Sequence, residues 1–187
     1  MEDLEWIISI KKQFEYYKAL GDKAIDQVSN TALFIRPDLF SNSIAIIVHH
    51  LSGNMKSRWT DFLTSDGEKP WRNRDMEFKD VLKTKEEVLH HWNTGWLCLF
   101  EAIASITQTT IHTPVYIRNA AHTIPEALNR QLTHYAYHIG QIVYLSKRSQ
   151  GNAWQSLSIP KNASASYNKT KFAEPRHTGH YIDDLLG

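Results

Sequence analysis

Four segments of this sequence place apolar residues three and four positions apart, which is the period of an α-helix with one buried face. The predicted helices cover residues 3 to 28, 42 to 63, 84 to 107 and 123 to 149. The chain has 187 residues, 42% of them hydrophobic, which is enough for one domain with a sizeable core. These features predict an all-α fold in which residues 1 to 150 form a bundle of four main helices.

Polar residues suited to capping precede three of the predicted helices. They are Ser41 or Ser43, Thr84 and Thr123. Glu87 lies three residues after Thr84, which is the spacing of a capping box, and Gly151 follows the end of the fourth helix. The limits of the fourth helix are therefore the best defined.

The connection between the second and third helices, residues 64 to 83, is far longer than the two to eight residues typical of helical bundles. Twenty extended residues reach about 66 Å, whereas a helix of that length spans about 30 Å. The segment is therefore long enough to cross the bundle, and we expect helices two and three to run parallel, in an up-down-down-up arrangement. The helical period alone leaves other topologies open.

Residues 151 to 187 are rich in Ser, Asn, Lys and Gly and show no sustained period. We expect them to form an extended C-terminal tail that packs on the bundle and belongs to the same domain. Its apolar anchors are Trp154, Leu157, Ile159, Tyr167 and Phe172.

Composition argues against several classes of protein. The 21 Lys and Arg nearly balance the 20 Asp and Glu, so nucleic acid is not expected as a primary partner. The longest apolar run, residues 44 to 48, is far short of the roughly 20 residues that span a membrane. Cys98 is the single cysteine, and Glu2, Asp3 and Glu5 interrupt any apolar leader, which predicts a cytoplasmic protein.

Two histidines four residues apart, His134 and His138, lie on the predicted fourth helix. This spacing puts the second side chain one turn above the first, about 40° round the helix, where two imidazoles can share a metal ion. Both lie on one flank of the apolar face, with Gln131. Spacing alone leaves a second interpretation equally open, in which they are hydrogen-bonded histidines on a helix surface.

A third ligand has to come from another part of the chain. On the second helix, His50 lies about 110° from the centre of the apolar face and His49 lies nearly opposite it, so His50 is better placed. His90 and His91 flank an acidic helix start and are expected in solvent. Histidines of the loops and tail are less favoured still: His112, His122, His177 and His180.

Several segments resemble a known family. The sequence Ile-Val-His-His-Leu-Ser-Gly-Asn-Met at 47 to 55, with the segments 58 to 63, 66 to 75 and 132 to 140, closely resembles a bacterial branch of the DinB superfamily. The resemblance implies an up-down-down-up four-helix bundle, with one metal held by a histidine on helix two and an H-x-x-x-H pair on helix four. In this branch the first position of His-Leu-Ser-Gly-Asn carries the ligand, which selects His50 over His49. The implied ligands are His50, His134 and His138.

The resemblance also bears on chemistry, because the superfamily includes thiol transferases using bacillithiol and a mycothiol-dependent isomerase. Three neutral imidazoles leave a divalent ion with an open coordination position, as in catalytic zinc sites. We expect a metal-dependent enzyme acting on a small molecule, either a thiol S-transferase with a low-molecular-weight thiol cosubstrate or a hydrolase. The alternative is a non-catalytic metal-binding or stress-response protein. Imidazole binds several divalent metals, so the ligand type alone does not identify the ion. We expect zinc in the cell, with nickel, iron and manganese as alternatives.

Other residues are weaker candidates, and no catalytic residue is assigned. Arg72 and Arg74 either bind an anionic substrate or pair with nearby carboxylates to hold the loop, and we favour the second interpretation. The carboxylates in question are Asp66, Asp75 and Glu77. Asn54, one turn after His50, either lines the site or faces solvent. Cys98 sits among apolar residues and is interpreted as a buried filler.

Six Trp, eight Tyr and seven Phe exceed what one small bundle readily buries, and aromatic residues are enriched in interfaces. We therefore expect a homodimer. Trp92 and Trp96, one helical turn apart, are candidates for a contact between subunits, although they also suit an ordinary core. The competing explanation is that the tail covers the same surface within one chain.

Overall fold

The computed structural model describes residues 2–183, and this part of the chain is mostly helical, with five α-helices and a two-stranded antiparallel sheet. The helices are α1 (Glu2–Asp26), α2 (Ile44–Trp59), α3 (Lys85–Ala104), α4 (Ile124–Gln150) and α5 (Ser164–Ala173). The strands are β1 (Val115–Ile117) and β2 (Ala120–His122), and short 3-10 turns cover Thr31–Phe34, Arg74–Phe78 and Gly151–Ala153. None of the helices in this part is long and apolar enough to cross a membrane.

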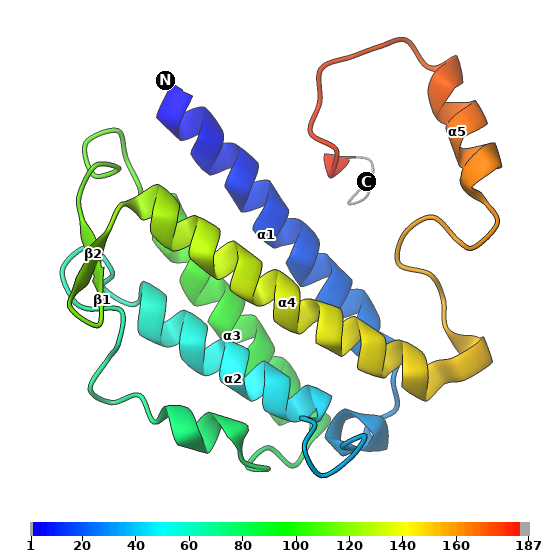
Figure 1. Cartoon of the computed structure of the whole chain (residues 1–187), viewed down its shortest axis with the longest axis horizontal. Helices are drawn as coiled ribbons and strands as arrows, with labels where there is room; N and C mark the ends of the chain where they lie inside the picture. The colour runs from blue at the N-terminus through cyan, green and yellow to red at the C-terminus, as the bar shows by residue number, and fades with distance from the viewer. Residues whose placement is uncertain (1, 184–187) are drawn as a thin grey trace.

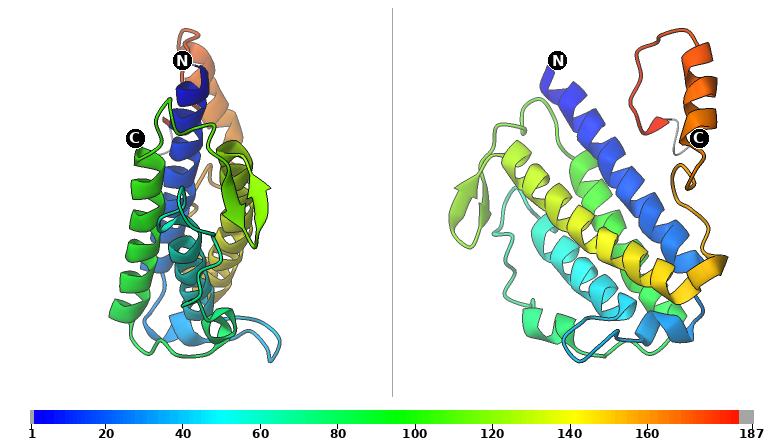
Figure 2. Two further views of the ribbon diagram at one scale, coloured as in Figure 1. Left: turned by 90° about the vertical axis from the view of Figure 1, so that its left-hand side faces the viewer. Right: turned by 45° about the vertical axis from the view of Figure 1, so that its right-hand side comes forward.

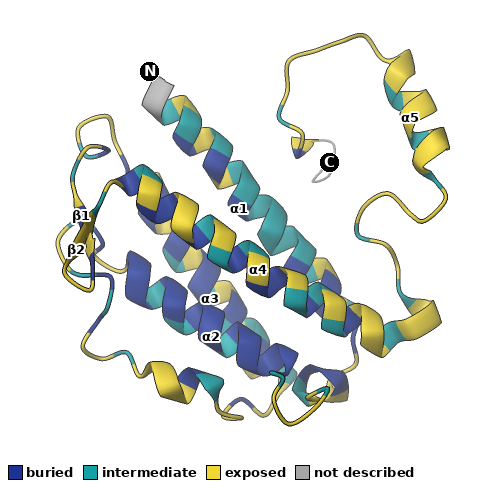
Figure 3. Ribbon diagram, viewed as in Figure 1, coloured by how far each residue is buried: buried dark blue, intermediate teal, exposed yellow. Residues whose placement is uncertain are grey.

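The four long helices share one core. Helix α2 packs on α3 and α1 packs on α4, while α4 also contacts α2 and α1 also contacts α3 (Figures 1 and 2). The sides that face one another are buried and the outer sides are exposed (Figure 3). Phe14, Trp96 and Tyr135, from α1, α3 and α4, form a cluster of aromatic rings with centroids 5.8 to 6.5 Å apart. The amphipathic period of each helix is therefore satisfied by mutual burial.

Capping residues set the helix ends as the sequence predicts. The Ser43 hydroxyl accepts a hydrogen bond from the Ile46 amide, and Thr84 forms a capping box with Glu87. Thr123 forms a second capping box at the start of α4, and Gly151 follows its last residue. The four predicted helices are thereby confirmed, with ends displaced by at most four residues.

The β1–β2 hairpin was not predicted. Its two-residue turn places Arg118 and Asn119 at positive φ, which is the geometry of a tight hairpin turn. The Asp66 carboxylate accepts hydrogen bonds from both amides of this turn, at 2.9 and 2.8 Å. The Gly67 amide donates to the Tyr116 carbonyl at 2.7 Å. The hairpin is thus fixed to the segment between α2 and α3.

The prediction of an extended tail is wrong for residues 164–173, which form α5. Helix α5 lies apart from the other helices in Figures 1 and 2, and its Phe172 is 84% exposed. The tail is held before and after α5: Trp154 and Leu157 pack against the core, and Asp183 pairs with Lys12 at 2.6 Å. No residue of α5 is buried. A helix without a buried face does not need apolar residues at helical spacing, so this segment lacks the pattern by which a helix is predicted.

Trp92 and Trp96 are core residues, and the suggestion that they contact a second subunit is wrong. Their side chains are 2% and 0% exposed, and the Trp92 indole nitrogen donates to Asp22 at 2.6 Å. The rings pack edge to face, with centroids 5.5 Å apart. These two side chains hold α3 against α1 within one chain.

Candidate metal centre

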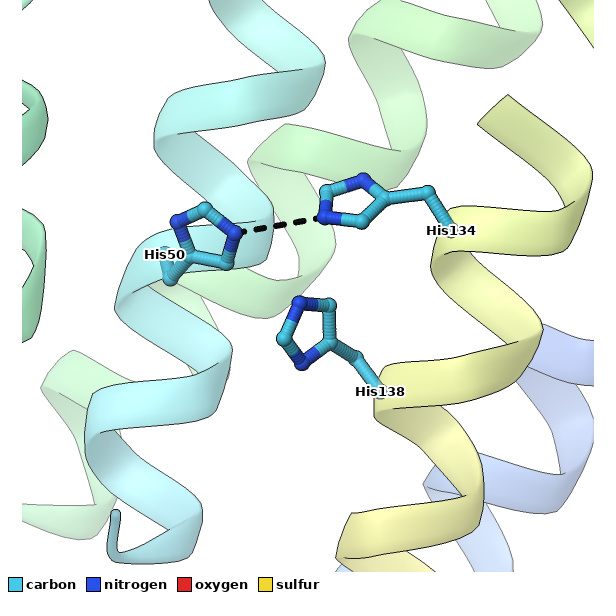
Figure 4. Close-up of side chains that lie close together, drawn as sticks. All are labelled: His50, His134 and His138. Atoms are coloured by element: carbon cyan, nitrogen blue, oxygen red, sulfur yellow. Dashed lines mark hydrogen bonds between the residues drawn. The ribbon is translucent and has the colours of Figure 1, made fainter. Parts of the chain in front are cut away.

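Three histidines from two helices converge on one point. His50 comes from α2, and His134 and His138 come from adjacent turns of α4 (Figure 4). One ring nitrogen of each lies within 4.8 Å of the other two, and Nε2 of His50 is 3.3 Å from Nε2 of His134. Two nitrogens bound to one tetrahedral zinc lie about 3.4 Å apart, because each bond is about 2.0–2.1 Å long. The cluster therefore has the donors and the spacing to hold one divalent metal ion.

The other histidines of the described chain stay outside this cluster. The His49 ring packs edge-on against His91, with centroids 5.1 Å apart, and His90 is exposed on α3. Within residues 2–183, the three clustered histidines form the only group of three or more His, Cys, Asp or Glu side chains arranged to hold a metal. Almost all of α2 is buried, which explains why His50 is only 4% exposed although it lies off the centre of the apolar face.

Glu77, in the segment between α2 and α3, orients His50. Its carboxylate accepts a hydrogen bond from Nδ1 of His50 at 2.8 Å and a bidentate pair from Arg72 at 2.7 and 2.9 Å. Burial alone would raise the pKa of Glu77, but the hydrogen bonds from His50 and Arg72 outweigh it and lower that pKa. With Nδ1 committed to the carboxylate, Nε2 of His50 carries the lone pair that can bind a metal.

A glycine on α2 makes room for this carboxylate. Gly53 lies three residues after His50, and a Cβ there would be 2.7 Å from Cδ of Glu77 and closer still to Oε1. The Phe78 ring stacks on the His50 ring, with the two centroids 4.6 Å apart. The glycine of the His-Leu-Ser-Gly-Asn segment thus permits the close approach of Glu77 to α2.

Both histidines of α4 are held in the neutral form. Burial, together with the neighbouring imidazoles of His138 and His50, lowers the pKa of His134 to about 3. Burial also lowers the pKa of His138 to about 4. Nδ1 of His138 donates to Oε1 of Gln141 at 2.9 Å, which leaves its Nε2 free. Neutral rings with free lone pairs are the form that binds metal ions.

The remaining predicted site residues lie near the cluster in different roles. Arg72 pairs with Glu77, as the loop-holding interpretation requires, whereas Asp66 binds the hairpin turn. The Arg74 guanidinium lies 5.1 Å over the Phe78 ring. Asn54 is buried, and its Oδ1 accepts a hydrogen bond from the Tyr135 hydroxyl at 3.2 Å. The same hydroxyl accepts a hydrogen bond from the indole nitrogen of Trp59.

Cys98 is half-buried on α3 and takes no part in the histidine cluster. Burial raises the pKa of its thiol, although the Thr60 hydroxyl lies 3.6 Å from the sulfur. Cys98 is therefore half-buried and not fully buried as predicted, but a protonated thiol is a weak nucleophile.

A cavity of about 230 Å³ opens beside His50 and His134. Its other lining residues are Asn54, Arg58, Arg72, Arg74, Arg118, Arg130 and Gln131. Sequence reasoning missed Arg58, Arg118 and Arg130 as site residues, and it missed the contact between Glu77 and His50. No sequence pattern marks them, because they come from separate elements that only the tertiary fold brings together.

A family model described as "Protein of unknown function (DUF1572)" matches residues 2–163, which include all four long helices and the three histidines. No curated protein and no solved structure matches the sequence.

Proposed function

The chain belongs to the DUF1572 family of proteins of unknown function, and we propose that it is a metal-dependent enzyme acting on a small molecule, as a thiol S-transferase or a hydrolase. One observation carries this proposal: three neutral or carboxylate-oriented imidazoles meet beside an open cavity. Three protein ligands with space beside them are typical of catalytic metal sites, whereas structural sites usually have four.

We further propose that the fold is the up-down-down-up four-helix bundle of the DinB superfamily. The helix directions in Figure 1 support this arrangement, because α1 and α4 run one way and α2 and α3 run the other, with the long segment between α2 and α3 passing outside them. The position of the histidines, one on α2 and a pair on α4, supports the same relationship.

The roles of the chain's own residues follow from their contacts. His50, His134 and His138 would hold the ion, which we propose is zinc, and Glu77 would keep Nε2 of His50 directed to it. When bound, such an ion supplies Lewis-acid chemistry and favours the ionised form of a thiol. Because Cys98 is half-buried with a raised pKa, a reacting thiol would come from a cosubstrate.

An activity screen tests the proposal. The zinc-loaded protein is expected to catalyse either transfer of a small thiol to an electrophilic acceptor or hydrolysis of an ester or amide. Activity should be lost in His134→Ala, which removes a ligand, and kept in His49→Ala, whose ring packs on His91. Stoichiometric metal without turnover in either reaction class would contradict an enzymatic role and favour a metal-binding protein.

We also propose that the chain forms a homodimer. The support is the exposed apolar side chains both outside the tail and on it, including Phe40 and, on α5, Phe172, which are 98% and 84% exposed. Light scattering at micromolar concentration is expected to give twice the mass of one chain. A mass near 21.6 kDa would contradict the proposal.

A further inference from the structure

The cavity beside the histidines has an unusual concentration of positive charge. Five of its nine lining residues are arginines, and none of those nine residues is acidic. The arginines come from four separate parts of the fold: Arg58 from α2, Arg72 and Arg74 from the segment before α3, Arg118 from the hairpin turn and Arg130 from α4. The whole chain has a net charge of only +1, so this concentration is local.

Two carboxylates, Glu68 and Glu77, contact three of these five guanidinium groups, so the positive charge is incompletely neutralised. Glu77 is occupied by Arg72 and His50. Oε2 of Glu68 is shared by three arginines, lying 3.2 Å from Arg58, 3.4 Å from Arg72 and 3.2 Å from Arg118. Five positive charges against two negative ones leave a surplus of three at this wall of the cavity.

Two of the arginines have no carboxylate partner among residues 2–183, namely Arg74 and Arg130. One buried donor at the same wall also has no hydrogen-bond partner within residues 2–183, namely Nε of Arg58, whose residue is 7% exposed. Because buried donors in proteins are nearly always hydrogen-bonded, this unpartnered donor supports a site for a hydrogen-bond acceptor beside Arg74 and Arg130.

The position of Arg130 connects the charge to the histidines. Arg130, His134 and His138 follow one another at intervals of four residues on α4, so their side chains form one stripe with about 6 Å between successive positions. A group held by Arg130 therefore lies beside the proposed metal centre. The planar guanidinium fork matches the oxygens of a carboxylate or a phosphate, which it binds in pairs of parallel hydrogen bonds.

We propose that this arginine-lined cavity binds a small molecule through an oxyanion, a carboxylate or a phosphate. The volume of about 230 Å³ is below the range of pockets for drug-sized ligands, which fits a compact anion. That this molecule is the substrate rests on the proposed function, but its binding through Arg130 and Arg74 does not require the metal.

Calorimetric titration of the metal-free, full-length protein tests the inference at low ionic strength, with inorganic phosphate and succinate as separate probes. At least one probe is expected to bind with one equivalent per chain, and affinity should fall with added salt. Arg130→Gln and Arg74→Gln should each weaken binding about tenfold or more, because a charge-assisted hydrogen-bond pair is lost. The probe that binds more tightly identifies the oxyanion.

Arg148→Gln is the matched control. Arg148 is also exposed on α4 and lies five turns after Arg130 on the same face, away from this cavity. Binding of neither probe, or equal weakening by Arg148→Gln and Arg130→Gln, would overturn the inference. Anion binding in a protein that fails to bind metal would sink the proposed function alone, whereas metal binding without anion binding would sink only this inference.

Discussion

Replacement of either α4 histidine, as His134→Ala or His138→Ala, is expected to abolish stoichiometric binding of a divalent metal ion. Each substitution removes one of three protein donors, and the remaining pair cannot complete a three-point site. His50→Ala should have the same effect. Elemental analysis of the purified, untagged variants, after incubation with zinc and removal of the excess, gives the metal content per chain.

His49→Ala is the control for the α2 ligand. The two residues are neighbours in sequence, but the His49 ring packs on His91 while His50 faces the pair on α4. The His49→Ala variant should keep one metal per chain. Equal loss of metal in the His49 and His50 variants would show that the ligands are assigned wrongly.

Glu77→Ala is expected to weaken zinc affinity by about 10- to 100-fold, which is the usual cost of losing the carboxylate that orients a ligating histidine. The same substitution leaves the guanidinium of Arg72, whose side chain is 2% exposed, without its main counter-ion. Breaking a buried ion pair from one side costs about 3 kcal/mol or more, so the free energy of unfolding should fall by that order. A chelator competition titration and urea unfolding measure the two effects separately.

Two further variants separate orientation from stability. Gly53→Ala keeps the carboxylate but displaces it, because the new Cβ overlaps Glu77, and should also weaken zinc binding. Glu101→Ala removes an exposed carboxylate from α3 and should change neither quantity. Unchanged zinc affinity in both Glu77→Ala and Gly53→Ala would refute the orienting role of Glu77.

The parts of the molecule predicted from sequence are those that local chemistry determines. Capping residues such as Thr84 and Thr123 specify where helices begin, whatever the helices later contact. The four-residue interval between His134 and His138 likewise places both rings on one helix face before any tertiary contact is considered. Local spacing alone does not select His50 over His49. That choice rested on the family resemblance together with the position of His50 on the helical wheel.

The parts that were not predicted are of two kinds. Some depend on contacts between segments that are distant in the sequence, and others lack the sequence pattern by which such an element is usually recognised. Glu77 lies 27 residues from His50, and its approach depends on the path of an irregular segment and on the space left by Gly53. The hairpin has Arg118 and Asn119 at its turn in place of the usual glycine, and α5 has no buried face to generate a period. Arg130 resembles an ordinary surface arginine until the fold places it beside the other four.

Crystallographic measurement of anomalous scattering above the zinc absorption edge, on untagged protein grown with zinc, tests the three-histidine centre most directly. We expect one strong peak between α2 and α4, about 2.0–2.1 Å from a ring nitrogen of each of His50, His134 and His138. Glu77 should remain hydrogen-bonded to Nδ1 of His50. A zinc ion bound elsewhere, for example between His49 and His91, with no density between the three histidines, would contradict it.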